Sequence, residues 1–298
     1  MSKRPFFRDQ SGSDPAYINT RDVDNCFARR ARENCERLWD IYEPYADPEF
    51  LTEISSHFDA RYWEMYLTTS LIEHGYKVSC PKPGPDVGIR FNGARIWFEA
   101  TSPTRGADGA ADQVPEPQDG EMRIVPNEKI VLRYLNSISE KYHRQYTIWI
   151  KNGVVKPTDG FVIAINPRQL RFEHVDASPP RILQAAFAIG NPYAAIDRQT
   201  MKVIKTGYQF RDRIQKTSGA IVPTGVFHQN EYTGLSGLLC SRVDVANQPD
   251  KMGADFQLVP NPKAEAPLWT EFRLRGTYYR IESTKDGYVA IPEMIDAQ

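Results

Sequence analysis

The chain has 298 residues, of which 41% are hydrophobic and 25% are charged, values close to those of globular proteins. This composition excludes a disordered or fibrous protein, and the lack of an apolar run of about 18 residues predicts no membrane span. The formal net charge of −1 gives no global signal for nucleic acid, so such a partner needs a local basic patch.

The cysteines are too widely spaced to indicate a zinc site or a disulfide framework. They are Cys26, Cys35, Cys80 and Cys240, and they form no CxxC pair. The first 15 residues also lack the apolar stretch of a secretory signal. We therefore expect a cytoplasmic protein in a reducing environment.

The first 48 residues are predicted to form an N-terminal tail and helix, followed by a main domain over residues 49–298. Residues 1–20 are polar and indicate a loose tail. Residues 22–42 repeat apolar side chains at spacings of three and four, which is typical of an amphipathic helix. A second helix is expected over residues 57–74, followed by a short strand at 76–79.

Asn92-Gly93 stands between two alternating segments, residues 86–91 and 95–100, and is a strong hairpin signal because a type I′ turn needs two positive φ angles. A two-residue loop fixes the register, so Asp86 lies opposite Glu99. Alternation then sorts the apolar side chains onto one face, which we expect against the core. Asp86 and Glu99 are predicted to lie side by side on the other, polar face.

Two opposed carboxylates repel each other, so Asp86 and Glu99 need compensation. A shared proton would raise the pKa of one of them. A divalent cation would satisfy both, because hard oxygen ligands suit Mg²⁺ or Mn²⁺. The alternative is that both side chains splay into solvent or pair with arginine. Arg90 and Arg95 lie too far along the hairpin to be direct partners.

The rest of the chain alternates between loop, helix and strand. Residues 102–126 are rich in Pro, Gly, Ala and Asp and predict a long loop, whereas residues 127–146 carry an apolar stripe at helical spacing. The short apolar run at 160–166 is typical of a buried strand. We expect a core over about 57–166 and a strand-rich C-terminal elaboration over 167–298.

Within this core, Glu64 lies in a predicted helix, Asp86 follows Pro85, and Glu99 precedes Ala100. This order of a helix, an acid, a hairpin, a second acid and a helix with a basic residue resembles the PD-(D/E)xK nuclease superfamily. The resemblance implies an α/β fold with a restriction-endonuclease-like α-β-β-β-α-β core and a mixed central sheet, here with an added N-terminal helix. It also implies that Asp86, Glu99 and Glu64 are ligands of one or two Mg²⁺ ions.

The chain departs from the family at Thr101, where the family usually has a lysine that orients the attacking water and stabilises negative charge. Some members carry the basic residue on the following helix, and Lys141 fits that pattern. Arg133, Ser137 and Lys141 lie at four-residue steps and share one helix face, which Arg144 extends. We expect Lys141 to replace the motif lysine; if it does not face the acids, the protein is an inactive relative.

Residues 202–216 form the best local basic patch, because five cations stand against the single acid Asp212, with Tyr208 and Phe210 interleaved. Such groups usually contact nucleic-acid phosphates, although a solvated surface would have the same composition. The predicted nucleic-acid contacts are Lys202, Lys205, Arg211, Arg213 and Lys216, together with Arg133, Ser137 and Arg144 on the helix.

Together these features favour an endonuclease that needs Mg²⁺ or Mn²⁺ and hydrolyses phosphodiester bonds, with DNA favoured over RNA. The candidate catalytic residues are Asp86, Glu99, Lys141, Glu64 and Thr101. The alternatives are a catalytically inactive nucleic-acid-binding or scaffolding protein with a nuclease fold, and an RNA-directed nuclease or effector. Because many enzymes of this fold cut two strands as dimers, a homodimer is a further expectation.

Overall fold

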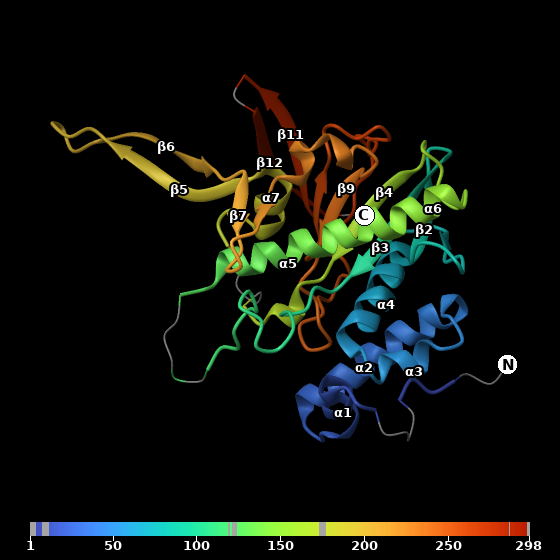
Figure 1. The fold of residues 1–298 in the computed structure, drawn as a ribbon. Helices are drawn as coiled ribbons and strands as arrows, with labels where there is room; N and C mark the ends of the chain where they lie inside the picture. Colours follow the sequence, from blue (N-terminus) through green and yellow to red (C-terminus); the bar gives the residue numbers. More distant parts are fainter. Residues whose placement is uncertain are drawn as a thin grey trace.

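The computed structural model describes residues 4–7, 12–118, 120, 124–172, 177–285 and 287–296. These residues form a mixed α/β fold in which helices cover both faces of one large sheet (Figure 1). Within these ranges, no helix combines the length and the hydropathy that a bilayer crossing requires. All four cysteines carry free thiols.

The N-terminal helices pack into one core with the sheet. They are α1 (Pro15–Asp22), α2 (Cys26–Tyr42), α3 (Phe50–Ile54) and α4 (Phe58–Glu73), with a 3₁₀ turn at Glu43–Tyr45. For the described part of residues 1–20, the predicted loose tail is wrong, because Phe6 and Tyr17 are buried in this core. Asp14 caps α1 by accepting the backbone N–H groups of Ala16 and Tyr17. The division at residue 48 stays a prediction.

The described residues form an eight-stranded mixed sheet with the order β1-β2-β3-β4-β9-β10-β11-β12. Its strands are β1 (Val78–Ser79), β2 (Val87–Phe91), β3 (Ala94–Thr101), β4 (Gly160–Ile165), β9 (Gly237–Cys240), β10 (Gln257–Pro260), β11 (Gly276–Thr284) and β12 (Gly287–Ile295). The first three strands pair antiparallel, whereas β4 lies parallel to both β3 and β9. A parallel pair needs a crossover connection, and here a helix supplies it.

That crossover helix is α5 (Asn127–Glu140), which joins β3 to β4. It continues through a π-helical turn (Lys141–Tyr146) into α6 (Thr147–Lys151), so the helix predicted to end at residue 146 runs on to Lys151. The order α4-β1-β2-β3-α5-β4 is the predicted α-β-β-β-α-β order. π-helical turns are rare in proteins and are often found at functional sites.

The predicted hairpin register is confirmed. Gly88 pairs with Trp97, and the adjacent pair is Val87 with Phe98. The turn residues Asn92 and Gly93 have φ angles of 47° and 83°, as a type I′ turn requires. The last paired residues therefore place Asp86 at the open end of the hairpin, beside Glu99.

Both faces of the hairpin are buried toward its open end, which differs from the expectation of one apolar and one polar face, whereas Arg90 and Arg95 beside the turn are exposed. Val87 and Phe98 pack in the core that contains α4. On the opposite face, Trp97 packs with Phe161 in a second core that contains α5, and its indole N–H donates to Asp159 at 3.0 Å. Because the crossover helix covers this face, the carboxylate of Glu99 lies inside the protein.

The C-terminal part is rich in strands, as predicted. Two strands, β5 (Ile189–Ile196) and β6 (Val203–Phe210), form a ribbon that projects from the body of the protein (Figure 1). A smaller pair is formed by β7 (Arg213–Gln215) and β8 (Ile221–Pro223). The remaining helices are α7 (Arg181–Phe187) and 3₁₀ turns at Arg168–Leu170, Val226–His228 and Asn230–Tyr232.

The close contact across the hairpin gives a test of the fold. A Cβ atom added at Gly88 would overlap the six-membered ring of Trp97. We expect Gly88→Ala to lower the free energy of unfolding by about 1–3 kcal/mol, a typical effect of overpacking, as measured by urea denaturation. Gly160→Ala is the matched control, because a Cβ atom there meets Ile96 at an ordinary 3.4 Å. Equal losses of stability in the two variants would contradict the packing.

Candidate functional site

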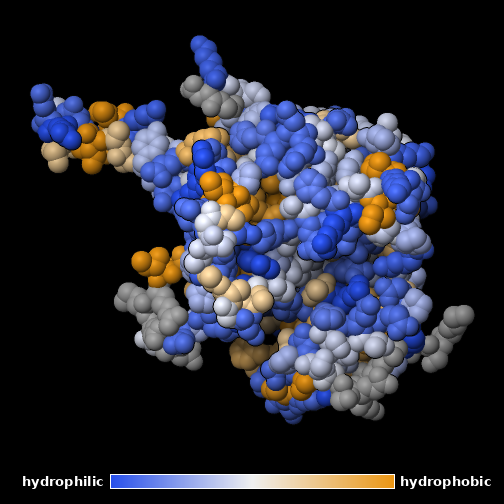
Figure 2. Space-filling model, in the orientation of Figure 1, coloured by the Kyte–Doolittle hydropathy of each residue, from blue (hydrophilic) through white to orange (hydrophobic). Residues whose placement is uncertain are grey.

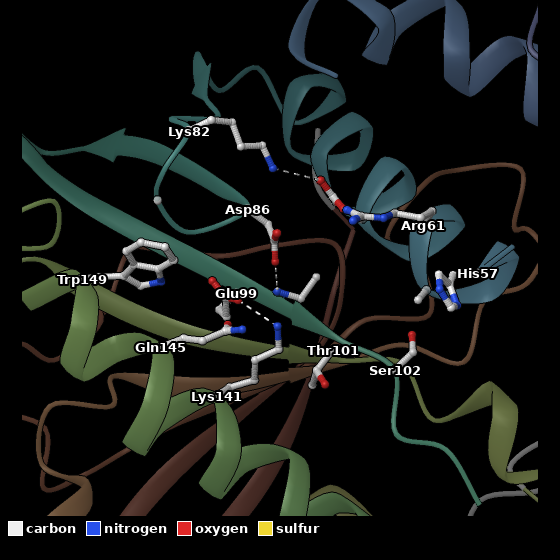
Figure 3. Close-up of a pocket in the computed structure, with 14 residues that line it drawn as sticks. His57, Arg61, Lys82, Asp86, Glu99, Thr101, Ser102, Lys141, Gln145 and Trp149 are labelled. Carbon is white, nitrogen blue, oxygen red and sulfur yellow. Dashed lines mark hydrogen bonds and ion pairs between the residues drawn. The ribbon is translucent and has the colours of Figure 1, made fainter. Parts of the chain in front are cut away.

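A pocket of about 430 Å³ opens where α4, the loop before β2, the end of β3 and the π-helical turn meet (Figure 3). Its charged lining residues are Arg61 and Glu64 of α4, Lys82 and Asp86 of the loop, Glu99 of β3 and Lys141 of the turn. Other polar lining residues are His57, Thr101, Ser102, Gln145 and Trp149. Three carboxylates and three cations therefore face a single cavity.

Asp86 and Glu99 lie close together at the open end of the hairpin. An oxygen of Asp86, Oδ2, accepts the backbone N–H of Ala100 at 2.7 Å, which holds its carboxylate against the strand that carries Glu99 (Figure 3). Glu99 is only 3% exposed, and no arginine of the described chain pairs with either acid. The alternative in which Glu99 splays into solvent or pairs with arginine is therefore wrong.

Lys141 reaches the acids from the crossover helix. Its Nζ lies 2.9 Å from Glu99 Oε1, and the two side chains are 19% and 4% exposed, respectively. Burial acts to lower the pKa of Lys141, but the charges of Glu99 and Asp86 raise it overall. Lys141 is thus held as a cation in the pocket. Thr101 also lines the pocket, but from the end of β3.

The two acids retain protons unusually strongly. Burial, with the neighbouring charges of Glu99 and Glu64, raises the pKa of Asp86 to about 8, although Lys141 and the Ala100 N–H oppose the shift. Burial also raises the pKa of Glu99, against the lowering effect of Lys141. Because the two groups interact, they titrate as a pair. The pair therefore releases its protons at higher pH than free carboxyl groups do.

Glu64 lies in the same pocket but is already surrounded by donors. Tyr42 donates its hydroxyl to Glu64 Oε1 at 2.9 Å, and Arg61 lies 2.5 Å from Oε2. Lys82 Nζ is 3.9 Å from Oε1 and 3.5 Å from Asp47. These contacts compensate the buried charge of Glu64 and orient Arg61 and Lys82 toward the cavity (Figure 3).

Several buried polar atoms of this pocket make no well-formed hydrogen bond to a described residue. They are Ser102 Oγ, Gln145 Oε1, Glu99 Oε2 and Trp149 Nε1. The Trp149 indole N–H nevertheless interacts with the carboxylate of Glu99 and acts to lower its pKa. Most buried polar side-chain atoms in proteins have a partner, so each exception needs an explanation. Ser102 and Gln145 therefore offer polar atoms to the cavity that no other described residue uses.

Asp86 and Glu99 are the residues of this pocket that could hold a divalent cation. In the part of the chain that the structure describes, no three His, Cys, Asp or Glu side chains are grouped to hold a metal ion. Mg²⁺ commonly binds through one or two carboxylates and completes its shell with water or phosphate oxygens. Asp86 and Glu99 could supply that smaller set.

The helix residues predicted to contact nucleic acid lie outside the lining of this pocket. Arg133 donates to the backbone carbonyl of Thr104 at 2.6 Å, and Arg144 pairs with Glu140 at 3.5 Å on the surface. Ser137 is half-buried. Of the face shared by Arg133, Ser137 and Lys141, only Lys141 reaches the pocket.

The predicted basic patch divides into free and paired cations. Lys202 and Lys205 are exposed on the projecting ribbon, and neither forms an ion pair with a described residue. Arg211 pairs with Glu128 at 3.3 Å, and Arg213 pairs with Asp212 at 3.0 Å. Lys216 lines a small cavity of about 100 Å³ that Arg133 also lines.

Sequence reasoning did not identify Arg61, Lys82 and Trp149 as parts of the site. Two of them carry a local signal, because Arg61 is one helical turn before Glu64 and Trp149 lies eight residues, or two helical turns, after Lys141. Lys82 carries no such signal, since a folded loop brings it to α4.

Comparisons of the chain with protein-family models, with curated proteins and with solved structures find no match. The assignment of a function therefore depends on the chemistry of the pocket.

The raised pKa of Asp86 predicts how stability changes with pH. Its ordinary pKa is 3.8, so between pH 4 and 8 the folded protein binds a proton that the unfolded chain has lost. We expect the stability of the metal-free protein to fall as pH rises through this window, by at most about 1.4 kcal/mol per pH unit. Asp86→Asn keeps the acceptor for Ala100 and should flatten this dependence in urea denaturation. Parallel pH profiles for the variant and the parent would refute the assignment.

Proposed function

We propose that the protein is a Mg²⁺-dependent nuclease whose active site is the pocket containing Asp86, Glu99 and Lys141. The observation that carries this proposal is the 2.9 Å contact between Lys141 and Glu99, beside an acid that retains its proton. Lys141, which follows α5 on the crossover, brings to Glu99 the positive charge that Thr101 lacks. The element order α4-β1-β2-β3-α5-β4 supports a resemblance to the PD-(D/E)xK superfamily.

Each residue has a defined role in this proposal. Asp86 and Glu99 would hold the ion, because they offer adjacent carboxylates in one pocket. When bound, Mg²⁺ would polarise the phosphoryl group and lower the pKa of water. Lys141 donates a hydrogen bond to a phosphate oxygen or to the attacking water and offsets negative charge. Arg61 and Lys82 attract the anionic backbone to the pocket mouth.

A phosphodiester backbone fits the charges of the pocket. Its lining contains three cations and three carboxylates, so a divalent cation at Asp86 and Glu99 would give the pocket the net positive charge that complements nucleic-acid phosphates. We take DNA as the first substrate to test, with RNA as the alternative for the same site. A homodimer would allow the two strands of a duplex to be cut together. The oligomeric state is therefore measured by sedimentation alongside the cleavage assays.

A second function is favoured by the same contact. Lys141 already compensates Glu99, and the described residues group no three metal-ligating side chains. A site whose buried acid is already neutralised by a lysine suits a nucleic-acid-binding or scaffolding protein that keeps a nuclease fold without catalysis. The two proposals differ in one respect, because only the first requires a divalent cation.

Cleavage assays test the nuclease proposal. Supercoiled plasmid, duplex DNA, single-stranded DNA and RNA are incubated with Mg²⁺ or Mn²⁺. We expect Asp86→Asn, Glu99→Gln and Lys141→Met each to lower the cleavage rate by about 10²–10³, the usual effect of removing a group that stabilises developing charge. Lys151→Met is the matched control, because Lys151 is an exposed lysine on the same helical segment outside the pocket.

Two outcomes would exclude this proposal. If the parent protein cleaves none of these substrates with either ion, the non-catalytic function replaces it. If Lys141→Met cleaves as fast as Lys151→Met, Lys141 is not the functional lysine. Circular dichroism and urea denaturation of each variant separate loss of activity from loss of fold.

Binding of Mg²⁺ is tested separately by thermal unfolding. A ligand at one hundred times its Kd adds about 2.7 kcal/mol to the stability of the folded state. We expect this stabilisation to be larger at pH 8.5 than at pH 6.5, because the ion competes with the proton on Asp86, whose pKa is about 8. Glu99→Gln should lose the effect, and Glu140→Gln, an exposed acid on α5, should keep it. Equal Mg²⁺ stabilisation of both variants would place the ion elsewhere.

A further inference from the structure

A second pocket, of about 300 Å³, lies at the base of the β5–β6 ribbon and is not part of the proposed active site. Its walls include the side chains of Phe187, Phe210, His228 and Tyr288, which come from α7, β6, a 3₁₀ turn and β12. Segments far apart in the sequence thus bring four rings to one small cavity. Most of the pocket wall is apolar, which suits a flat organic group better than an ion.

His228 lies at the centre of this aromatic pocket. Its ring centroid is 5.8 Å from that of Phe210, 6.1 Å from that of Phe187 and 5.7 Å from that of Tyr288. His228 Nε2 is 3.2 Å from the carbonyl oxygen of Phe187, so Nε2 carries the hydrogen in this contact. In the neutral ring, Nδ1 is then left as a hydrogen-bond acceptor.

Phe210 provides an open surface for stacking. It is 71% exposed, whereas Phe187 is only 6% exposed and is fixed in the core. Its ring contacts that of His228 and leaves the rest of its surface exposed beside the pocket. Tyr208 precedes it by two residues on β6, lines the same pocket and is 49% exposed.

The ribbon beyond this pocket is positively charged. Its residues 189–210 contain three cations, Arg198, Lys202 and Lys205, and one acid, Asp197, for a net charge of +2. The acid is occupied locally, because Asp197 accepts the backbone N–H groups of Gln199 and Thr200. The three cations are exposed and form no ion pair with a described residue. Figure 2 shows hydrophobic residues along the projecting ribbon between hydrophilic ones.

We propose that the aromatic pocket binds an unpaired nucleobase, while Lys202, Lys205 and Arg198 of the ribbon lie along the phosphates of the same single strand. This inference rests on the proposed function, because it names the part of a nucleic acid that the protein recognises away from the active site. Stacking on aromatic rings together with cations along the backbone is the common basis of single-strand binding. A stacked base pair has no free face to present to the pocket, so duplex DNA does not engage it.

The test uses a short oligodeoxynucleotide with a single 2-aminopurine, whose fluorescence falls when the base stacks. The measurement is made in EDTA, so that no cleavage takes place and Asp86 and Glu99 are not required. We expect the parent protein to quench the probe, and Phe210→Ala to weaken binding about tenfold, the equivalent of one lost stacking contact. Phe210→Trp should restore binding and quenching, because it keeps an aromatic face.

Two controls separate the pocket from the ribbon and from the fold. Val289→Ala changes an exposed side chain next to Tyr288 that does not line the pocket, and it should bind like the parent. Tyr288→Leu should weaken binding as Phe210→Ala does, and circular dichroism checks that both variants are folded. The same probe annealed to its complement should bind more weakly and show no quenching by the protein.

The outcomes distinguish this inference from the nuclease proposal. Equal affinity and quenching for the parent and Phe210→Ala would overturn the base pocket, even if the protein cleaves DNA. Quenching that depends on Phe210, in a protein that cleaves nothing, would keep the pocket and remove the nuclease. If the parent binds no oligonucleotide, or if sedimentation shows that Phe210→Ala only dissociates a dimer, the pocket does not bind a base.

Discussion

The buried carboxylate of Glu99 is the constraint on which the rest of the site depends. It lies on a strand whose sheet is covered on both faces, where an uncompensated charge would be costly. Two features of the fold reduce the cost of burying this charge. The crossover helix brings Lys141 to one oxygen of Glu99, and the hairpin brings in Asp86, which responds with a raised pKa. Trp149 also interacts with the carboxylate of Glu99, so three side chains meet around this one buried charge.

The part of the site that depends on local geometry could be predicted from the sequence. Asn92-Gly93 determines the turn, the turn determines the register, and the register brings the two acids to the open end of the hairpin. Helical spacing also indicated that Lys141 shares a face with Arg133. It could not show which of these residues points into the pocket, because that depends on where α5 lies on the sheet.

The remaining features depend on tertiary contacts that no short pattern contains. The second face of the hairpin is buried because α5 covers Trp97, and alternation along a strand cannot show what covers it. Phe6 packs against Trp39 of α2, a contact that the composition of residues 1–20 does not indicate. Lys82 reaches Glu64 only through the folded loop. The composition of residues 202–216 indicated cations interleaved with aromatic rings. It could not show that Lys202 and Lys205 lie exposed on the ribbon while Arg211 and Arg213 form ion pairs.

The account requires a metal ion to bind between Asp86 and Glu99, where Lys141 now compensates one of the two charges. The most direct test is anomalous diffraction from crystals of the protein soaked in Mn²⁺ at pH 8.5, above the pKa of about 8 of Asp86. The account predicts one anomalous peak in the 430 Å³ pocket, within ligand distance of both carboxylates. A pocket without a peak, in which Lys141 keeps its contact with Glu99 at saturating Mn²⁺, would contradict it.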